Sequence, residues 1–184
     1  MNRTVLELVE AEYRRYRIVG ELAMRQVEPE ELHERSGRGN SIATIVWHLA
    51  GNLESRFTDF LTTDGEKQWR DRDAEFEPRD ASDREVAQRW EQGWGVLFGA
   101  LWGLTDEDLP ARVTIRGVPF RVDEALLRSL AHTAYHVGQI VLLARAFRGD
   151  DWEYLSIPPG GSEAYNANPV REKSSVPGSF HPRS

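Results

Sequence analysis

The sequence has no cysteine, which excludes disulfide bonds, metal sites made of thiolates and a cysteine nucleophile. It has no surplus of basic residues either. Its formal net charge of −7 at pH 7 argues against binding the phosphate backbone of a nucleic acid. No stretch approaches the ~18 uncharged apolar residues of a membrane span, and the first residues lack the apolar core of a signal peptide. We therefore expect a soluble, cytoplasmic protein that binds neither nucleic acid nor membrane.

The sequence does contain enough apolar material for one compact domain. Of its 184 residues 40% are apolar and six are tryptophans, so a wholly disordered chain is excluded. A domain of this length buries about two-thirds of the surface that its unfolded chain exposes. We place the domain at residues 1–165 and expect residues 166–184, whose last part is rich in Ser and Pro, to form a flexible tail.

Apolar residues that recur every three or four positions predict long helices and no extended sheet. The helices are expected at residues 4–27, 40–61, 83–103 and 123–147. Before the last of them, two short apolar runs flank Arg116-Gly117 and predict a hairpin-like excursion. The predicted fold class is therefore all-α, a four-helix bundle interrupted by this hairpin.

The predicted helices carry local signals at their ends. Asn40 or Ser41 is expected to cap the second helix, and Asp123 the fourth. Ser82, with Glu85 three residues later, predicts a capping box on the third helix. Glycines weaken this third helix by about 1 kcal/mol each relative to alanine. We expect the close approach of a neighbouring helix to compensate at these positions, which are Gly93, Gly95, Gly99 and Gly103.

Two of the predicted helices are unusual because long stretches of them carry no charge. Neither residues 40–53 nor residues 129–144 contain Asp, Glu, Lys or Arg, whereas a helix with a solvent face normally carries charge in every turn. We therefore expect both stretches to be covered nearly all round. Each nevertheless contains histidine: His48 in the first, and His132 and His136, spaced i, i+4 on one face, in the second.

Two interpretations of these histidines stay open. In one, a polar strip on the fourth helix is simply its wet side; the strip consists of Arg128, His132, Tyr135, His136 and Gln139. In the other, the strip lines a cavity, where desolvated imidazoles stay neutral and can bind Zn, Ni, Fe or Cu. Two ligands from one helix and His48 from another would make a three-histidine site whose fourth position is open to water or substrate.

Other histidine chemistries fit this sequence less well. The segment from His132 to His136 lacks the glutamate that a zinc protease places after its first histidine. A carboxylate-bridged di-iron bundle needs two Glu-x-x-His motifs, and the one match, Glu30 to His33, lies in a predicted loop. We interpret His33 and His181, which have polar neighbours, as solvent residues.

Residues 40–49 (NSIATIVWHL) and 132–140 (HTAYHVGQI) resemble the two signature segments of the DinB/YfiT-like superfamily. Residues 59–67 (DFLTTDGEK) and 155–158 (LSIP) are similar to one uncharacterised branch of it, so the resemblance covers about residues 4–165. It implies a four-helix bundle, commonly dimeric, in which three histidines hold a divalent metal ion. Carried over by position, the metal ligands are His48, His132 and His136.

The resemblance also suggests a class of activity. Relatives include transferases that use bacillithiol, mycothiol or glutathione, a maleylpyruvate isomerase, and proteins labelled metal-dependent hydrolases. We expect a homodimeric enzyme that uses Zn, Ni or Fe to activate a low-molecular-weight thiol or a water against a small-molecule substrate. Asn52 and Gln139, each one turn beyond a histidine, are candidates to orient that ligand or to brace an imidazole N–H. Ordinary interhelical hydrogen bonds are an equally good interpretation of both.

The alternative is a metal-binding structural or regulatory dimer without turnover. Tryptophans would supply its partner face, although aromatic residues at helical spacing are more often core; they are Trp47, Trp90, Trp94 and Trp102. Residues 64–91, with ten acidic and six basic side chains, are interpreted as a solvated loop and helix face rather than a docking patch. The chain after Trp152 either folds over the cavity mouth through Tyr154, Tyr165 and Asn166 or only covers a helix, and the sequence does not choose.

Overall fold

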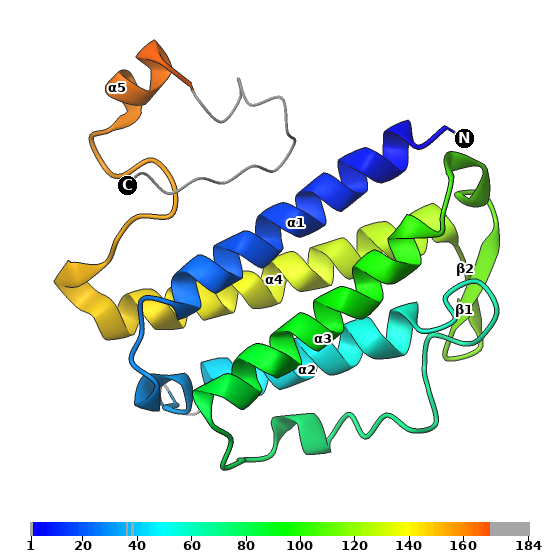
Figure 1. Cartoon of the computed structure of the whole chain (residues 1–184), viewed down its shortest axis with the longest axis horizontal. Coiled ribbons are helices and arrows are strands. Elements are labelled where there is room, and N and C mark those ends of the chain that lie inside the picture. The colour runs from blue at the N-terminus through cyan, green and yellow to red at the C-terminus, as the bar shows by residue number, and fades with distance from the viewer. Residues whose placement is uncertain (1, 36, 38, 170–184) are drawn as a thin grey trace.

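The structure, a computed structural model, describes residues 2–35, 37 and 39–169. These residues are mostly helical, with one two-stranded antiparallel sheet (Figure 1). The helices are α1 (Thr4–Met24), α2 (Ile42–Phe57), α3 (Asp83–Trp102), α4 (Val122–Arg148) and the short α5 (Ser162–Ala167). Single 3-10 turns stand at Glu30–Leu32, Ala74–Phe76, Asp106–Asp108 and Gly149–Asp151.

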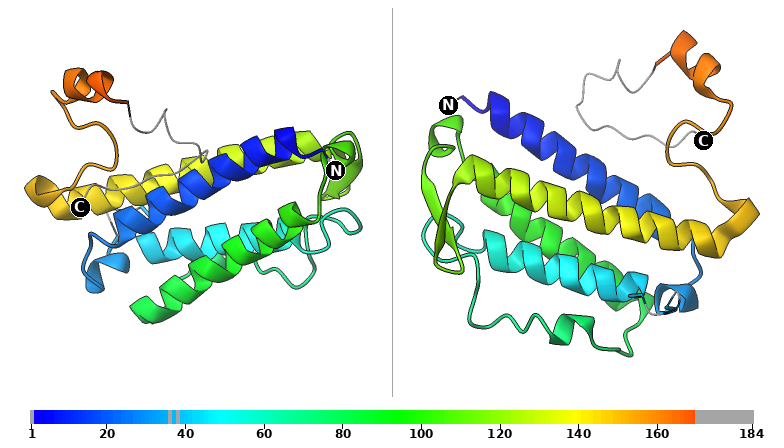
Figure 2. Two further views of the ribbon diagram at one scale, coloured as in Figure 1. Left: turned by 45° about the horizontal axis from the view of Figure 1, so that its top comes forward. Right: turned by 180° about the vertical axis from the view of Figure 1, so that it is seen from behind.

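The four long helices of the described chain lie alongside one another (Figures 1 and 2). α2 packs against α3 and α1 against α4, and further contacts join α2 to α4 and α1 to α3. The apolar stripes predicted from the sequence therefore meet in one core, whose largest fully buried side chains are Trp94 and Tyr13. Tyr13 also ties α1 to α4, because its buried hydroxyl donates to the carbonyl of Leu126 at 3.0 Å.

The start of α2 agrees with its prediction, and its end comes earlier. Ser41 rather than Asn40 caps the helix, and its Oγ accepts from the backbone N–H of Thr44 at 3.2 Å. The helix ends at Phe57 instead of near residue 61 because the backbone of Thr58 is extended, with ψ 124°, and Asp59 after it is left-handed, with φ 49°.

The capping box predicted for α3 is confirmed, since the side chains of Ser82 and Glu85 bond to each other's backbone N–H. The predicted cap of α4 is wrong. Asp123 lies inside the first turn, and the N-cap is Arg121, whose backbone N–H donates to the Glu124 carboxylate at 2.8 Å. The chain passes from a strand straight into α4, so residue 123 is already helical.

The predicted hairpin is confirmed as β1 (Arg112–Ile115) and β2 (Val118–Arg121), paired antiparallel. Between them Arg116 and Gly117 have φ of 56° and 72°, the backbone of a two-residue turn that matches the twist of the strands. The carboxylate of Asp64 accepts from the backbone N–H of both turn residues, at 2.8 Å each. The loop after α2 is thereby fastened to the hairpin, which fixes the place of Arg116.

The charge-free stretch of α2 is buried almost throughout, as predicted, but the prediction of full coverage is wrong for α4. Tyr135 and Leu142 are 64% and 68% exposed, and Ala131 and Gly138 between them are exposed too. These positions follow one another along one face of the helix. The single chain therefore leaves an apolar, charge-free stripe of α4 uncovered.

The chain beyond α4 first lies against the end of α1. Trp152 is 8% exposed, and Gln26 exchanges two hydrogen bonds with the backbone of Glu153, at 2.9 and 3.1 Å. α5 runs across the boundary predicted at residue 165, and residues 170–184 of the predicted tail lie outside the described residues.

None of the helices in the described ranges combines the length and the apolar character needed to cross a membrane.

Of the glycines on α3, Gly93 is the one that a neighbouring helix requires. A Cβ at this position would lie 2.6 Å from Cα and 2.9 Å from Cβ of Ala50 on α2. The expected close approach is thus found at Gly93, while Gly95 and Gly99 face open space, so the expectation is wrong for those two. Gly103 is the C-cap of the helix.

We predict that Gly93→Ala destabilises the protein by about 1–3 kcal/mol, because the added methyl must push α3 away from α2. The matched control is Gly95→Ala two residues along the same helix, which is expected to gain about 0.5–1 kcal/mol from helix propensity alone. Urea unfolding of both variants measures the difference. Similar effects of the two substitutions would contradict the close contact at Gly93.

Candidate metal centre

α2 and α4 bring the three predicted histidines together. His48 comes from α2, and His132 and His136 stand one turn apart on α4. Their ligand atoms all lie within 4.8 Å of one another, and their ring centroids are 4.5, 4.8 and 5.3 Å apart. His48 is 4% exposed and His136 9%. The three imidazoles form a group that could hold a metal ion.

The spacing of two of these rings suits one tetrahedral ion. Nε2 of His48 lies 3.3 Å from Nε2 of His132. Two nitrogens bound to one tetrahedral ion at the ~2.0–2.1 Å of a zinc–imidazole bond would be about 3.3 Å apart. An all-nitrogen donor set also suits zinc or a first-row transition ion better than calcium or magnesium, which prefer oxygen. The residues present therefore fit such an ion.

A buried carboxylate orients the imidazole of His48. Oε2 of Glu75, a residue only 7% exposed, lies 2.9 Å from His48 Nδ1. An ionised carboxylate can only accept, so Nδ1 carries the hydrogen and Nε2 turns its lone pair toward the other histidines. Carboxylates commonly hold metal-binding histidines in this way.

Arg70 holds the same carboxylate from its other side. Its Nε and Nη2 donate to the two oxygens of Glu75 at 2.8 and 2.9 Å. Burial raises the pKa of Glu75, but the hydrogen bonds from His48 and Arg70, with the charge of Arg70, bring it below its usual value. Glu75 is therefore ionised at neutral pH and available to His48.

Of the two side chains predicted to brace the site, Gln139 is hydrogen-bonded to a histidine, whereas Asn52 is not within the described residues. Oε1 of Gln139 lies 2.8 Å from Nδ1 of His136, so this ring too keeps its hydrogen on Nδ1 and its lone pair on Nε2. Asn52 lines a cavity beside His48 and, within the described residues, makes no hydrogen bond to an imidazole. Tyr135 stands outside that cavity, with its ring edge-on to His136 at 5.0 Å.

Burial keeps the histidines of α4 neutral. It lowers the pKa of His132 to about 3, helped by the other two imidazoles and by the charges of Arg70 and Arg56. Burial and His48 also lower the pKa of His136, although its hydrogen bond with Gln139 acts in the opposite direction. A neutral imidazole offers its lone pair without first losing a proton, so both rings are ready to bind a metal at pH 7.

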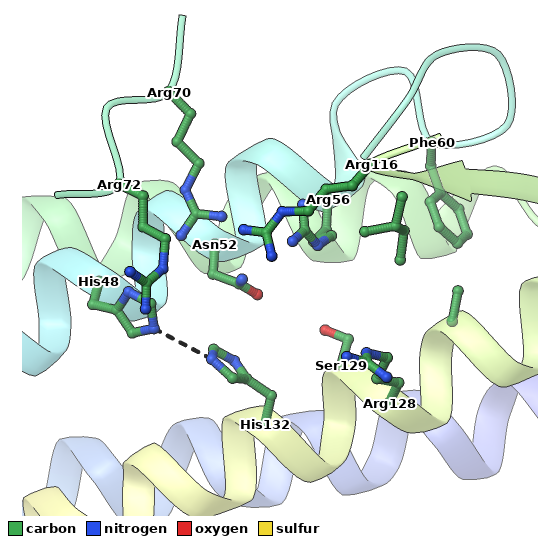
Figure 3. A pocket seen from close by; sticks show the side chains of 12 residues that line it. His48, Asn52, Arg56, Phe60, Arg70, Arg72, Arg116, Arg128, Ser129 and His132 are labelled. Carbon is green, nitrogen blue, oxygen red and sulfur yellow. Dashed lines mark hydrogen bonds between the residues drawn. The ribbon is translucent and has the colours of Figure 1, made fainter. Parts of the chain in front are cut away.

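A cavity of about 230 Å³ adjoins the histidines (Figure 3). His48 and His132 stand at one end of it and Phe60 at the other. Its wall comes from α2, the loop before α3, the hairpin turn and α4, and among the described residues it contains no carboxylate. It does contain five arginines, which are Arg56, Arg70, Arg72, Arg116 and Arg128.

The sequence interpretation placed Arg128 on a cavity wall, which is confirmed, but missed Glu75 and the other four arginines. It takes residues 64–91 as a solvated loop and helix face, which is wrong for Glu75 and for Arg70, whose side chain is 2% exposed. A histidine on an uncharged helix does signal that Nδ1 needs a partner. Ten acidic residues in the segment could supply it, and nothing local singles out Glu75.

Two further expectations about aromatic residues are settled by burial. Trp90 and Trp94 are 3% and 1% exposed and belong to the core, so they supply no partner face, whereas Trp102 is 82% exposed. His33, predicted to be a solvent residue, is half-buried with its Nε2 enclosed, and that prediction is wrong. His181 lies outside the described residues.

The described chain after Trp152 does not cover the cavity mouth. The cavity is bounded by the hairpin turn, while α5 lies at the opposite end of the molecule (Figures 1 and 2). Tyr154 instead stacks under Arg145 of α4, 5.3 Å from the guanidinium carbon to the ring centroid.

We predict that the metal-free protein loses stability between pH 7.5 and pH 5. An unfolded His132 gains a proton below about pH 6.5, whereas the folded one does not until about pH 3, so protons favour the unfolded state in this window. Solvent screening at this partly exposed ring reduces the loss to roughly 1 kcal/mol. Urea unfolding in the presence of a chelator measures it. The loss of unfolding free energy between pH 7.5 and pH 5 should be smaller in His132→Gln and unchanged in His33→Gln. Equal losses in the two variants would contradict the prediction.

A family model described as "Protein of unknown function (DUF1572)" matches residues 1–161. The match includes α1 to α4, the hairpin and all three histidines of the cluster. No curated protein and no solved structure matches the chain. Because the matched segment is most of the chain, we conclude that the protein belongs to the DUF1572 family.

Proposed function

We propose that this protein is a metal-dependent enzyme in which His48, His132 and His136 hold one divalent ion. The observation that carries the proposal is the convergence of three imidazoles, two of them oriented by Glu75 and Gln139 and two of them, His48 and His132, lining one end of a cavity. Such an ion, zinc, nickel or iron, lowers the pKa of a bound water or thiol and so supplies a nucleophile at neutral pH. A thiol-dependent transferase and a hydrolase are the reaction classes that this chemistry allows.

The cavity favours an enzyme over a purely structural metal site. A structural zinc site is closed by four protein ligands, and the group found within the described residues has three. The space beside His48 and His132 would admit a small-molecule substrate to the open position. A fourth protein ligand closing the shell would favour the alternative, a structural or regulatory dimer without turnover.

The arrangement of the helices supports the likeness to DinB/YfiT-like proteins. Each of α1 to α4 contacts two of the others, which is the packing expected of a four-helix bundle. The two resembling segments lie on α2 and α4 and carry the three histidines. We assign the chain to this bundle type on these two grounds.

The chain's own residues have defined tasks in this mechanism. Glu75 and Gln139 fix the Nδ1 hydrogens of His48 and His136, so that Nε2 of each ring would be free to hold an ion. Asn52, on the cavity wall beside His48, provides an amide that can orient the substrate or the nucleophile. The helix packing on the far side of the rings keeps bulk water away from them.

Metal binding is tested by the elemental content of purified protein and by zinc titration. Wild type is expected to hold one equivalent of metal, and His48→Ala and His132→Ala to hold well under that, because two imidazoles bind weakly. Glu75→Gln should keep the ligands but lower zinc affinity about 10–100-fold. His33→Ala, at a histidine that is not part of the cluster, is the matched control.

Circular dichroism confirms that each variant is folded before its metal content is compared. Full metal content in both alanine variants would refute the assignment of the ligands. Turnover is tested separately, by assaying zinc-loaded protein with several thiols and electrophiles and with ester substrates. Absence of metal-dependent turnover from the whole panel would favour the structural alternative.

We also propose that the chain forms a homodimer through α4. Leu127 is 59% exposed, and together with Tyr135 and Leu142 it continues the charge-free stripe along that helix. A contiguous apolar face of this kind is unusual on a monomer and typical of an interface. A second copy would cover the stretch that the single chain leaves open.

Sedimentation velocity tests the dimer. We expect wild type to sediment at twice the mass of one chain, and Leu142→Glu to sediment as a monomer because it places a charge in the stripe. Leu61→Glu, at a residue 42% exposed in the loop after α2, is the control and should remain dimeric. A monomeric wild type, or a dimeric Leu142→Glu, would contradict the proposal.

A further inference from the structure

The cavity beside the histidines gathers positive charge in a chain whose net charge is −7. Its five arginines come from separate parts of the fold. Arg56 lies on α2, Arg70 and Arg72 on the loop before α3, Arg116 in the hairpin turn and Arg128 on α4. Figure 3 shows Arg56 and Arg116 across the cavity from Arg128. Four segments thus direct guanidinium groups at one small space.

The neighbouring carboxylates do not neutralise this charge. Glu66 accepts from Arg56 at 3.1 Å and from Arg116 at 3.0 Å, so one carboxylate is shared by two arginines. Glu75 is likewise shared, between Arg70 and His48. Two carboxylates are therefore shared among three arginines and an imidazole, so the cavity keeps an excess of positive charge.

The two remaining arginines have no strong partner within the described residues. Arg128 makes no ion pair there, and its guanidinium carbon lies 5.7 Å from the centroid of the Phe120 ring. Arg72 Nη1 lies 3.6 Å from Asp73 Oδ1, but both side chains are exposed, and such a pair contributes little. The guanidinium carbon of Arg72 also lies 5.1 Å from the centroid of the Phe76 ring, a contact that leaves its N–H groups available. Both guanidinium groups are therefore free to bind a ligand.

Arg70 has a buried donor that no group of the described chain accepts. Its side chain is 2% exposed, and Nε and Nη2 are taken by Glu75, but Nη1 is buried without a hydrogen-bond partner among the described residues. A buried donor of a charged group is costly to leave unpaired. Holding Glu75 explains two of the three nitrogens of Arg70, and the third calls for an acceptor in the cavity.

We infer that the cavity binds a small organic anion through its carboxylate or phosphate groups. Guanidinium groups match both through paired hydrogen bonds. Phe60, Ile115 and Ala125 line the same space and suit a short carbon body. A volume of about 230 Å³ suits a small metabolite. That this anion is the substrate rests on the proposed function.

The position of the histidines indicates how such a ligand is used. His48 and His132 stand at the end of the cavity away from Phe60 (Figure 3). An anion held by the arginines along the cavity leaves its other end beside the proposed metal centre. The arginines therefore act as binding and orienting residues. Substitution of Arg72 or Arg128, which within the described residues do not pair with Glu75, should weaken anion binding without removing the metal.

Calorimetric titration of zinc-loaded protein tests this inference with three probes: succinate, inorganic phosphate and neutral succinamide. Succinate or phosphate should bind measurably, and succinamide should not. Arg128 is exposed, so its substitution should not affect folding. We expect Arg128→Gln to weaken anion binding about tenfold or more, and Arg72→Gln to weaken it less. Arg145→Gln, also on α4 but outside the cavity, is the matched control and should bind as wild type does.

The same titrations on metal-free protein separate this inference from the proposed function. If the protein takes up no added zinc but still binds an anion through Arg128, the metal site is refuted and the anion site is upheld. Two results in a protein that binds one zinc would overturn the anion site alone. One is that succinate and phosphate bind no better than succinamide, and the other is that they bind Arg128→Gln as well as wild type. Binding of phosphate but not succinate would support the anion site and assign a phosphate group to the ligand.

Discussion

The hydrogen bond between Glu75 and His48 is the interaction on which the rest of the site depends. It joins a loop residue to the middle of α2, where a side chain at Gly51 would overlap the Glu75 carboxylate. It fixes the imidazole tautomer, and through the same carboxylate it places the buried guanidinium of Arg70 at the cavity wall. One ionised carboxylate therefore sets the direction of a candidate metal ligand and of a candidate ligand-binding group.

A carboxylate shared by two basic groups occurs twice around the cavity. Glu66 bridges Arg56 and Arg116 as Glu75 bridges Arg70 and His48. In each case a carboxylate just outside the cavity wall holds two cationic or basic groups in place without cancelling the charge of both. Each glutamate therefore positions its two partners without neutralising both, and the arginines still present positive charge to the cavity. Mutating either glutamate should disturb orientation as well as charge.

The sequence predicted the parts of the structure that depend on local patterns. Helix spacing, the Ser82 cap and the Arg116-Gly117 turn are local signals, and the absence of charge around His48 correctly indicated burial. The rest depends on tertiary contacts. Glu75 resembles its nine acidic neighbours in residues 64–91 until the chain folds. On α4 the charge-free pattern was interpreted as burial within one chain, but the exposed stripe shows that absence of charge indicates an apolar surface without saying what covers it.

The proposed metal and anion sites are linked by electrostatics. Arg70 and Arg56 lower the pKa of His132, which keeps its lone pair available, but the same positive charges repel a cation placed on that lone pair. Glu75 offsets part of this repulsion, and an anion in the cavity would offset more. Two ligands of opposite charge in adjacent sites favour each other's binding, and the coupling is equal in both directions. The arginine-rich cavity and the histidine cluster are therefore best understood as two halves of one site.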